Sequence, residues 1–361
     1  MGRPRSTSRA AADGYIHSAS RIRERRSEQN QDQAGRYRHE AIDADGRKQN
    51  DSEALLKSYL FILFLLAVPF AASAQLISNP NPPVPAALAV GGAYTAAANG
   101  AEAIYWNPAG LAYGKGTDTR FAYQKPWNVG FLTHLSASAS TMLPSRKHGF
   151  AVGVQTLGTR DGGTTMASET EVSLAHGFML QQDIHSSLAF GYAVKLINYS
   201  LGESVVNGTN PAMDLGSAMT FGLDVGATAQ LWDRFKLGAA FKNINRPQMG
   251  ADSKRNLPQV FMGGLSYTPY YGVRTTFDLE RVISGETQFK GGLNATVVKP
   301  LDLRFGVTSN PNCFTAGFGL HYRELVLDYA FVYHPVLSPS HLVGIGFNLD
   351  QTLPEIWQAK K

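Results

Sequence analysis

Two histidines, a serine and an aspartate near the C-terminus are the residues whose types and spacing could do chemistry. His334 and His341 flank a short stretch, and Asp328 lies nearby in the sequence. Imidazole and carboxylate groups ligate metal ions, so these three residues could form a metal site. Ser340 directly precedes His341, and a serine beside a histidine can act as a nucleophile with its base. The segment therefore offers two candidate chemistries, a metal centre and a lipid hydrolase.

The rest of the sequence supports neither chemistry. None of the nine histidines lies in an HxxxH or HExxH motif, and the single cysteine, Cys313, excludes both a CxxC motif and an intrachain disulfide. A G-x-S-x-G nucleophile elbow is also absent. We therefore predict that the protein is not an enzyme and uses no metal ion or cofactor. In this interpretation His334 and His341 are structural residues at the rim of a β-barrel.

The charge of the chain is modest and unevenly distributed. Among 361 residues, 33 are Lys or Arg and 28 are Asp or Glu, which gives a formal net charge of +5. Residues 1–74 contain 12 of the basic and 9 of the acidic residues, which leaves 21 and 19 for the remainder. A body so close to neutral gives no support to nucleic-acid binding. The 36 glycines and 15 tyrosines are instead typical of an all-β protein with many tight turns.

The N-terminal region consists of segments that we do not expect to join the fold. Residues 1–53 are polar and cannot bury a core, so we expect them to be disordered, and a mis-assigned start codon would explain them. Residues 54–74 combine a lysine, a short apolar run and an Ala-Ser-Ala site, which together predict a secretory signal peptide. The apolar run is shorter than the ~20 residues of a membrane-spanning helix. We predict cleavage between Ala74 and Gln75.

Apolar residues alternate with polar or small ones through most of the remaining chain, which indicates β-strands with two different faces. In one such stretch Phe190, Tyr192 and Val194 share a face opposite Gly191 and Ala193. About fourteen stretches of this kind are predicted as strands: Thr119–Lys125, Phe131–Leu143, Lys147–Leu157, Glu169–Gln181, Ile184–Leu201, Gly216–Leu231, Phe235–Asn245, Pro258–Thr268, Gly272–Arg281, Thr287–Val298, Leu301–Ser309, Cys313–Tyr322, Leu325–Tyr333 and His341–Leu349.

Strand length, export and connector length together predict an antiparallel transmembrane β-barrel. The strands are longer than the five to six residues usual in globular sheets and match the ~9–11 of tilted membrane strands. The connectors alternate: Gln182-Asp183 and Lys299-Pro300 are examples of short ones, whereas Gly158–Ser168 and Gly202–Leu215 are longer. Short turns at one end and longer loops at the other are typical of outer-membrane barrels. We expect the barrel to span residues 118–350, with a tail at 351–361.

The segment between the signal peptide and the barrel, residues 75–117, is rich in Ala and Gly. Between residues 86 and 112, Glu102 is the only side chain charged at neutral pH. Small residues let backbones approach closely but cannot form a core of their own. A fourteen-stranded barrel is too wide for its wall side chains to fill. We therefore predict that this segment is a hatch inside the lumen, with Glu102 as its charged anchor to the wall.

We predict the positions of two further groups of residues in the barrel and the role of a third. Charged residues within strands should face the lumen, because a charge on the lipid face costs about 2–4 kcal/mol at mid-bilayer. These lumen candidates are Lys195, Asp224, Lys242, Asp278, Lys290, Arg304 and Asp328. Aromatic residues near strand ends, Trp127, Trp232, Tyr270, Tyr271 and Tyr322, should form interfacial belts. The last strand, with His341, Gly344, Gly346 and Phe347, has the pattern by which such barrels are recognised for assembly.

The chain also resembles a known group of proteins. The run Gly91-Gly92-Ala93-Tyr94, followed by Glu102 and by Trp106-Asn107-Pro108-Ala109-Gly110, resembles the N-terminal hatch of the FadL superfamily and its Asn-Pro-Ala signature. The run Phe241–Asn245 and the closing residues 328–347 are similar to the PorV/PorQ branch of that superfamily. The resemblance covers essentially all of residues 76–350 and implies a fourteen-stranded barrel with an internal hatch.

This resemblance implies several possible functions. PorV members act in type IX secretion, where they bind C-terminal signals of secreted cargo, whereas FadL members carry long-chain fatty acids and other hydrophobic compounds. A structural barrel without a channel is a third possibility. The implied partners are outer-membrane lipids, the barrel-assembly machinery, and either secretion-system proteins with their cargo or a hydrophobic small molecule. The expected location is the outer membrane of a bacterial cell.

Overall fold

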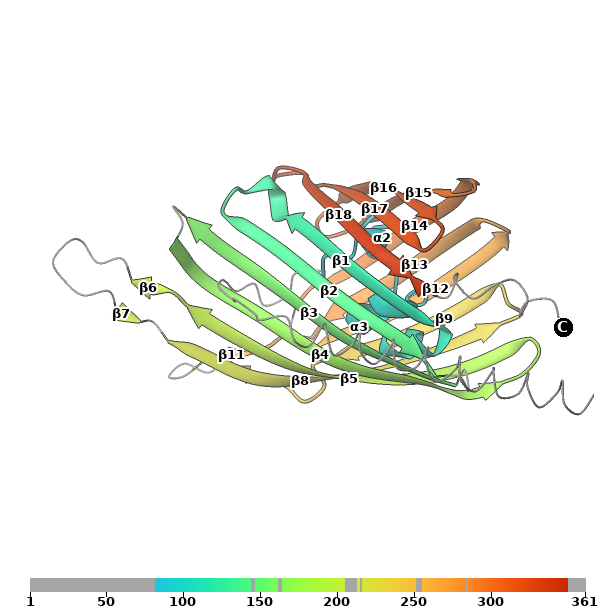
Figure 1. Ribbon diagram of the computed structural model, residues 1–361, viewed down its shortest axis with the longest axis horizontal. Helices are drawn as coiled ribbons and strands as arrows, with labels where there is room; N and C mark the ends of the chain where they lie inside the picture. The colour runs from blue at the N-terminus through green and yellow to red at the C-terminus, as the bar shows by residue number, and fades with distance from the viewer. Residues whose placement is uncertain are drawn as a thin grey trace, which may run out of the picture. The chain divides into compact units, whose positions relative to one another are not determined.

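Fourteen antiparallel strands close into a barrel in the computed structural model of the chain (Figure 1). The structure describes residues 82–143, 147–161, 164–204, 213–214, 216–250, 255–283 and 285–349. The predicted extension, signal peptide, cleavage site and C-terminal tail lie outside these residues. The predicted fold class, an all-β barrel of fourteen strands, is confirmed.

The elements have the following bounds in chain order. The helical turns are α2 (Pro85–Leu88), η1 (Gly100–Glu102), α3 (Ala103–Trp106), η2 (Pro108–Tyr113) and η3 (Pro126–Asn128). The barrel strands are β1 (Thr117–Lys125), β2 (Leu132–Met142), β3 (His148–Asp161), β4 (Thr164–Gln182), β5 (Ser186–Leu201), β8 (Ser217–Leu231), β9 (Phe235–Lys242), β12 (Val260–Tyr270), β13 (Val273–Val282), β14 (Thr287–Val298), β15 (Leu301–Thr308), β16 (Cys313–Tyr322), β17 (Leu325–Tyr333) and β18 (Ser340–Asn348). Four short strands lie in the loops: β6 (Glu203–Ser204) with β7 (Met213–Asp214), and β10 (Gln248–Met249) with β11 (Arg255–Asn256).

Each barrel strand pairs with its neighbours in the sequence, and the first strand closes the ring with the last. The β1–β18 pairing runs in register from Asp118 opposite Asn348 to Lys125 opposite His341. Every strand is therefore hydrogen-bonded on both sides, which removes the free edges that a flat sheet would expose.

The alternating sequence pattern places large apolar side chains on the outside of the barrel. On β5, Phe190, Tyr192, Val194 and Leu196 point outward and are 39–47% exposed, whereas Ala189 and Ala193 on the opposite face are fully buried. A band of exposed Phe, Leu, Val and Tyr of this kind suits a lipid environment. Among the described residues, no helix is long and apolar enough to cross a membrane.

The connectors alternate in length as predicted, with one correction. The predicted loop Gly158–Ser168 is mostly strand, because β3 continues to Asp161 and β4 begins at Thr164. The strand pattern continues through β-branched threonines on both sides, and a register shift between Thr159 and Arg160 accommodates the extension. The apolar alternation ends near Leu157, and the strand continues beyond it through backbone pairing that needs no apolar face.

Residues 82–113, which we call the internal segment, lie inside the barrel (Figure 1). Its helical turns and the loops between them contact all fourteen strands, which is possible only from within the lumen. Its apolar side chains, including Trp106 and Leu111, form a cluster with the small inward residues Ala151, Ala175 and Ala193 of the wall. Small residues on the inner face thus leave room for the segment, whose burial gives the barrel a core.

Candidate functional site

Asn107 ties the internal segment both to itself and to the wall. Its side chain is fully buried, and its Oδ1 accepts a hydrogen bond from the Ala109 amide at 3.1 Å, which caps the turn that Pro108 begins. Its Nδ2 lies within hydrogen-bond distance of the Thr95 carbonyl at 2.9 Å and of Thr228 Oγ1 on β8 at 3.1 Å. Asparagine fits this position because one planar amide supplies the acceptor and the donors that the turn and the wall require.

The two predicted hatch glycines lie where the internal segment turns against β14 to β16. Gly91 and Gly92 have φ values of 70° and 74°, a left-handed conformation that favours glycine. A Cβ atom on Gly91 would lie 2.8 Å from the Val307 carbonyl oxygen, so the wall also requires a residue without a side chain there. Thr315 Oγ1 accepts a hydrogen bond from the Gly91 amide at 2.9 Å and donates one to the Ala89 carbonyl at 3.0 Å. Gly110, the last residue of the motif, is packed directly against the Ala98 carbonyl.

Glu102 lies against β1, on the side of the internal segment that faces Arg120. Tyr94 donates a hydrogen bond from its hydroxyl to Glu102 Oε2 at 2.9 Å, and Arg120 Nε lies 3.7 Å from Glu102 Oε1. Burial raises the pKa of the Glu102 carboxyl above its ordinary value, and the positive charge of Arg120 opposes this rise. Burial and the neighbouring carboxylate also raise the pKa of the Tyr94 hydroxyl, which therefore stays protonated as a donor. Asp118 completes the group, because its Oδ1 lies 3.0 Å from Arg120 Nη1 and its Oδ2 accepts a hydrogen bond from the Ala101 amide.

All seven predicted lumen residues lie on the inner face of the barrel, and most form ion pairs. Lys195 pairs with Asp224 at 2.9 Å across β5 and β8, and Arg304 pairs with Asp328. Lys290 pairs with Glu280 on β13 at 2.6 Å. Asp278 instead accepts a hydrogen bond from the Thr95 amide at 2.8 Å, which makes it a second wall contact of the internal segment. Pairing of this kind offsets the cost of removing charges from water.

Lys242 differs from the other two predicted lumen lysines, Lys195 and Lys290. Among the described residues it forms no ion pair within 4.0 Å, and its ammonium lies 5.5 Å from the centre of the Trp106 ring. The Lys290 ammonium approaches the same ring at 5.8 Å, and Tyr94 meets it edge-on, with the two ring centres 6.2 Å apart. Trp106 is 1% exposed. The buried indole therefore lies near two lysine ammonium groups, and the face of an aromatic ring attracts cations.

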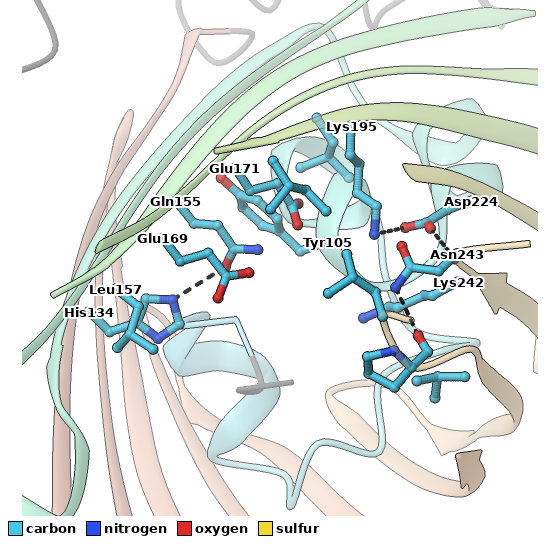
Figure 2. A pocket seen from close by; sticks show the side chains of 15 residues that line it. Tyr105, His134, Gln155, Leu157, Glu169, Glu171, Lys195, Asp224, Lys242 and Asn243 are labelled. Atoms are coloured by element: carbon cyan, nitrogen blue, oxygen red, sulfur yellow. Dashed lines mark hydrogen bonds and ion pairs between the residues drawn. The ribbon is translucent and has the colours of Figure 1, made fainter. Parts of the chain in front are cut away.

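A polar pocket of about 80 Å³ lies above Tyr105, on the side of the long loops (Figure 2). Figure 2 shows Glu169 and Glu171 of β4 on one side of it and Lys195, Asp224, Lys242 and Asn243 on the other. His134 and Gln155 lie beside the glutamates, with His134 Nε2 3.3 Å from Gln155 Oε1. The side chain of Asn243 donates a hydrogen bond from Nδ2 to the Pro258 carbonyl at 2.8 Å. The backbone amide of Asn243 donates a hydrogen bond to Asp224 Oδ1, also at 2.8 Å. The arrangement can bind a charged or hydrogen-bonding group.

A second cavity of about 260 Å³ lies beside the internal segment near β1 and β14 to β18. It is lined largely by apolar atoms, including those of Leu88, Trp127 and Val332. Trp127 was predicted in an interfacial belt, and the structure corrects this. Its φ of 51° turns the loop back toward the lumen, where Ser340 Oγ accepts a hydrogen bond from its amide at 2.6 Å. The other predicted belt residues, Trp232, Tyr270, Tyr271 and Tyr322, are exposed beside the short turns.

Comparison with known protein families matches residues 101–354 to the family described as "Type IX secretion system membrane protein PorP/SprF". The match covers more than two-thirds of the chain. The chain belongs to this family. The PorV/PorQ branch, to which the sequence is similar, is a finer assignment that this match does not make.

Several solved structures have a similar fold to this member of the PorP/SprF family. The toluene transporter TodX from P. putida is 15% identical and has a TM-score of 0.57, with 75% of this chain and 99% of that chain covered. The channel CymD, described as a monoaromatic hydrocarbon channel, is 13% identical with a TM-score of 0.51, over 74% of this chain and 97% of that one. A FadL homologue from Pseudomonas aeruginosa is 9% identical with a TM-score of 0.50, over 76% and 99%. At these identities the likeness shows the fold alone. No curated protein matches the chain.

The last strand of this family member presents different side chains to its two faces. His341 and Phe347 face outward, whereas Gly344 and Gly346 face inward. A Cβ on Gly344 would lie 3.0 Å from Pro85 Cγ of the internal segment, and Gly346 is packed directly against the Arg120 side chain. The two glycines therefore make room for the contents of the lumen at the seam between β18 and β1.

The structure does not bring together the residues near the C-terminus that were considered for a metal site or a hydrolase. Ser340 and Asp328 face the lumen, whereas His341 faces outward. Its Nδ1 lies 2.7 Å from the hydroxyl oxygen of Tyr329. His334 Nδ1 accepts hydrogen bonds from the amides of Val336 and Leu337 at 3.2 and 3.0 Å. Strand alternation sends adjacent residues to opposite faces, so Ser340 and His341 cannot act together. Within the described ranges, no group of three or more His, Cys, Asp or Glu side chains could hold a metal ion.

Sequence reasoning missed four lumen residues that the structure brings into the site. Asp118 and Arg120 surround Glu102, and Glu169 and Glu171 line the polar pocket. Strand parity could have found the first two, because Phe121 and Tyr123 mark the outer face of β1 and thereby place Asp118 and Arg120 on the inner one. Glu169 and Glu171 share a face of β4 in the same way. The omission arose from attention to charges at the middle of the predicted strands.

Proposed function

We propose that this protein is an outer-membrane component of a type IX secretion system and that it acts as a closed barrel rather than as an open channel. The family match supports a place in that system. One structural observation supports the closed state: every strand is paired on both sides while the internal segment contacts all fourteen strands from within. A closed wall without a lateral gap suits a protein that holds or hands over other proteins.

Deletion of the gene in the source bacterium tests this proposal. The expected result is that secreted proteins carrying a shared C-terminal domain no longer reach the cell surface, and that a plasmid copy restores them. A tagged full-length chain should also co-purify with secretion-system proteins from solubilised outer membranes. In planar bilayers the purified barrel should give almost no steady conductance. Normal secretion in the deletion strain would contradict the proposal.

The finer role of the PorV/PorQ type would be direct contact with cargo. The similarity of Phe241–Asn245 and of the closing residues 328–347 to the PorV/PorQ branch supports it. Crosslinking in living cells distinguishes this role: a cargo protein bound to the barrel supports a PorV-like role, whereas crosslinks confined to other secretion components point to a scaffold.

A second candidate function, passive transport of a hydrophobic compound, is supported by the apolar cavity beside the internal segment. It predicts slower uptake of a hydrophobic probe by the deletion strain and intact secretion. Substitution of Trp127, whose side chain lines this cavity, would then change uptake. Unchanged uptake in both strains would exclude this candidate, because passive transport requires flux through the barrel.

A further inference from the structure

The polar pocket has two walls of opposite charge. Glu169 and Glu171 project from β4, and Lys195 and Lys242 project from β5 and β9 on the opposite side (Figure 2). Among the described residues no ion pair within 4.0 Å joins Glu171 to either lysine, although its charge acts on both. Opposite charges held apart across a cavity create a strong local field, since buried charges are weakly screened. A dipolar guest aligned with that field would be stabilised.

The charges on the basic wall are incompletely neutralised. Lys195 is paired with Asp224 at 2.9 Å, whereas Lys242 has no carboxylate partner within 4.0 Å among the described residues. The Trp106 ring, 5.5 Å away, is the contact that the Lys242 ammonium makes with the internal segment. An ammonium held in this place can accept an anionic partner without displacing an existing one.

Among the described residues, two buried polar atoms at the pocket have no hydrogen-bond partner. Asn243 is 9% exposed and uses its Nδ2, but its Oδ1 has no partner in the part of the chain that the structure describes, and Figure 2 shows this oxygen directed into the pocket near Lys195. His134 is 1% exposed, and within the same described residues its Nδ1 also has no partner. Buried polar groups are nearly always satisfied, so an unsatisfied acceptor at a cavity points to a guest that donates a hydrogen bond.

The guest must therefore carry an anionic group for Lys242 and a hydrogen-bond donor for Asn243. The cavity of about 80 Å³ is several times larger than the ~10–15 Å³ that a single water needs, so it has room for a small guest. We propose that the pocket binds a small zwitterion, such as a free α-amino acid, with its carboxylate at Lys242 and its ammonium toward Asn243 Oδ1 and Glu171. A simple anion would leave Asn243 Oδ1 unsatisfied and would be repelled by the glutamates. A simple cation would be repelled by the two lysines.

The proposed binding site does not depend on the proposed role in secretion, so a negative result for one proposal leaves the other standing. The test is isothermal titration calorimetry of the full chain, purified as a folded barrel in detergent, with L-alanine. Propionate and ethylamine serve as comparison ligands, because each keeps one charge of alanine and lacks the other. The expected result is saturable binding of alanine and binding at least tenfold weaker for the two comparison ligands.

Variants on one strand provide the matched control. Lys242→Met should abolish alanine binding, whereas Lys236→Met should retain it. Both lysines face inward on β9, but Lys236 lies at the opposite end, 4.4 Å above the Tyr113 ring. If Lys242→Met does not fold, Glu171→Gln is the second variant, and its affinity for alanine should fall to that of propionate. Absence of alanine binding, equal binding of propionate, or full binding by Lys242→Met would each overturn the proposal.

Discussion

Lys290 Nζ lies 2.6 Å from Glu280 Oε2, and both side chains are buried on the inner faces of the neighbouring strands β14 and β13. The same ammonium faces the Trp106 ring of the internal segment at 5.8 Å. One lysine therefore joins two wall strands and contacts the segment within them. Since neither charge is near bulk water, each depends on the other for its solvation.

Replacing Lys290 alone should destabilise the barrel strongly. Lys290→Met leaves the Glu280 carboxylate buried without its partner, and we expect a loss of about 3–5 kcal/mol in the free energy of unfolding. Denaturant unfolding of the barrel in lipid vesicles measures this loss. The double variant Lys290→Met/Glu280→Gln is the control and should recover much of it, because no unpaired charge remains. A single variant as stable as the wild type would contradict the inferred dependence.

Asn107 should hold the internal segment in place. Asn107→Ala removes the cap of η2 and leaves the Thr95 carbonyl and Thr228 without a donor, so we expect a loss of about 2–3 kcal/mol. The internal segment should also become sensitive to protease in folded barrels, and steady conductance should rise in planar bilayers. Asn99→Ala is the matched control, because Asn99 is exposed and, among the described residues, its side chain donates to the nearby Ala97 carbonyl alone. Equal protease resistance of the two variants would count against this role.

Glu102 should make stability depend on pH. Its pKa in the folded barrel is raised, so the folded state binds the proton more tightly than the unfolded state. The stability that protonation contributes is complete below the ordinary carboxyl pKa and is lost as the pH rises through the raised value. We expect unfolding measured over a pH series that starts near the ordinary glutamate pKa of about 4.3 and rises from there to show a decline in stability that Glu102→Gln removes. Parallel pH profiles for the two proteins would show that Glu102 does not titrate differently in the fold.

Gly346 should be required at the closing seam. A Cβ there would lie 2.7 Å from the Thr119 carbonyl oxygen and would collide with the Arg120 side chain. We expect Gly346→Val to cost about 1–3 kcal/mol through overpacking, and to reduce the fraction of folded barrel on unboiled electrophoresis gels. Ile345→Val, on the outer face of the same strand, should assemble normally. Normal assembly of both variants would show that Arg120 can move aside at little cost.

Most of the fold could be predicted from the sequence, because period-two alternation and connector length are local properties of the chain. The predicted strand Leu325–Tyr333, for example, has the bounds of β17. The candidate site could be predicted less completely from the sequence than the fold. The cost of a charge on the lipid face predicted that Lys195 and Asp224 lie on the inner face. Which charges meet depends on the register between neighbouring strands, and the sequence does not specify that register. The orientation of Trp127 also escaped prediction, because it depends on two consecutive left-handed residues, Trp127 and Asn128, neither of which is a glycine.

The ladder between β1 and β18 closes the ring by joining the first and the last strands of the barrel. β18 also pairs with β17 on its other side. A variant that lacks β18 would therefore leave β1 and β17 with unpaired edges, and the wall around the internal segment would be open along its whole length. Enclosure of the segment thus depends on the strand that lies farthest from it in the sequence.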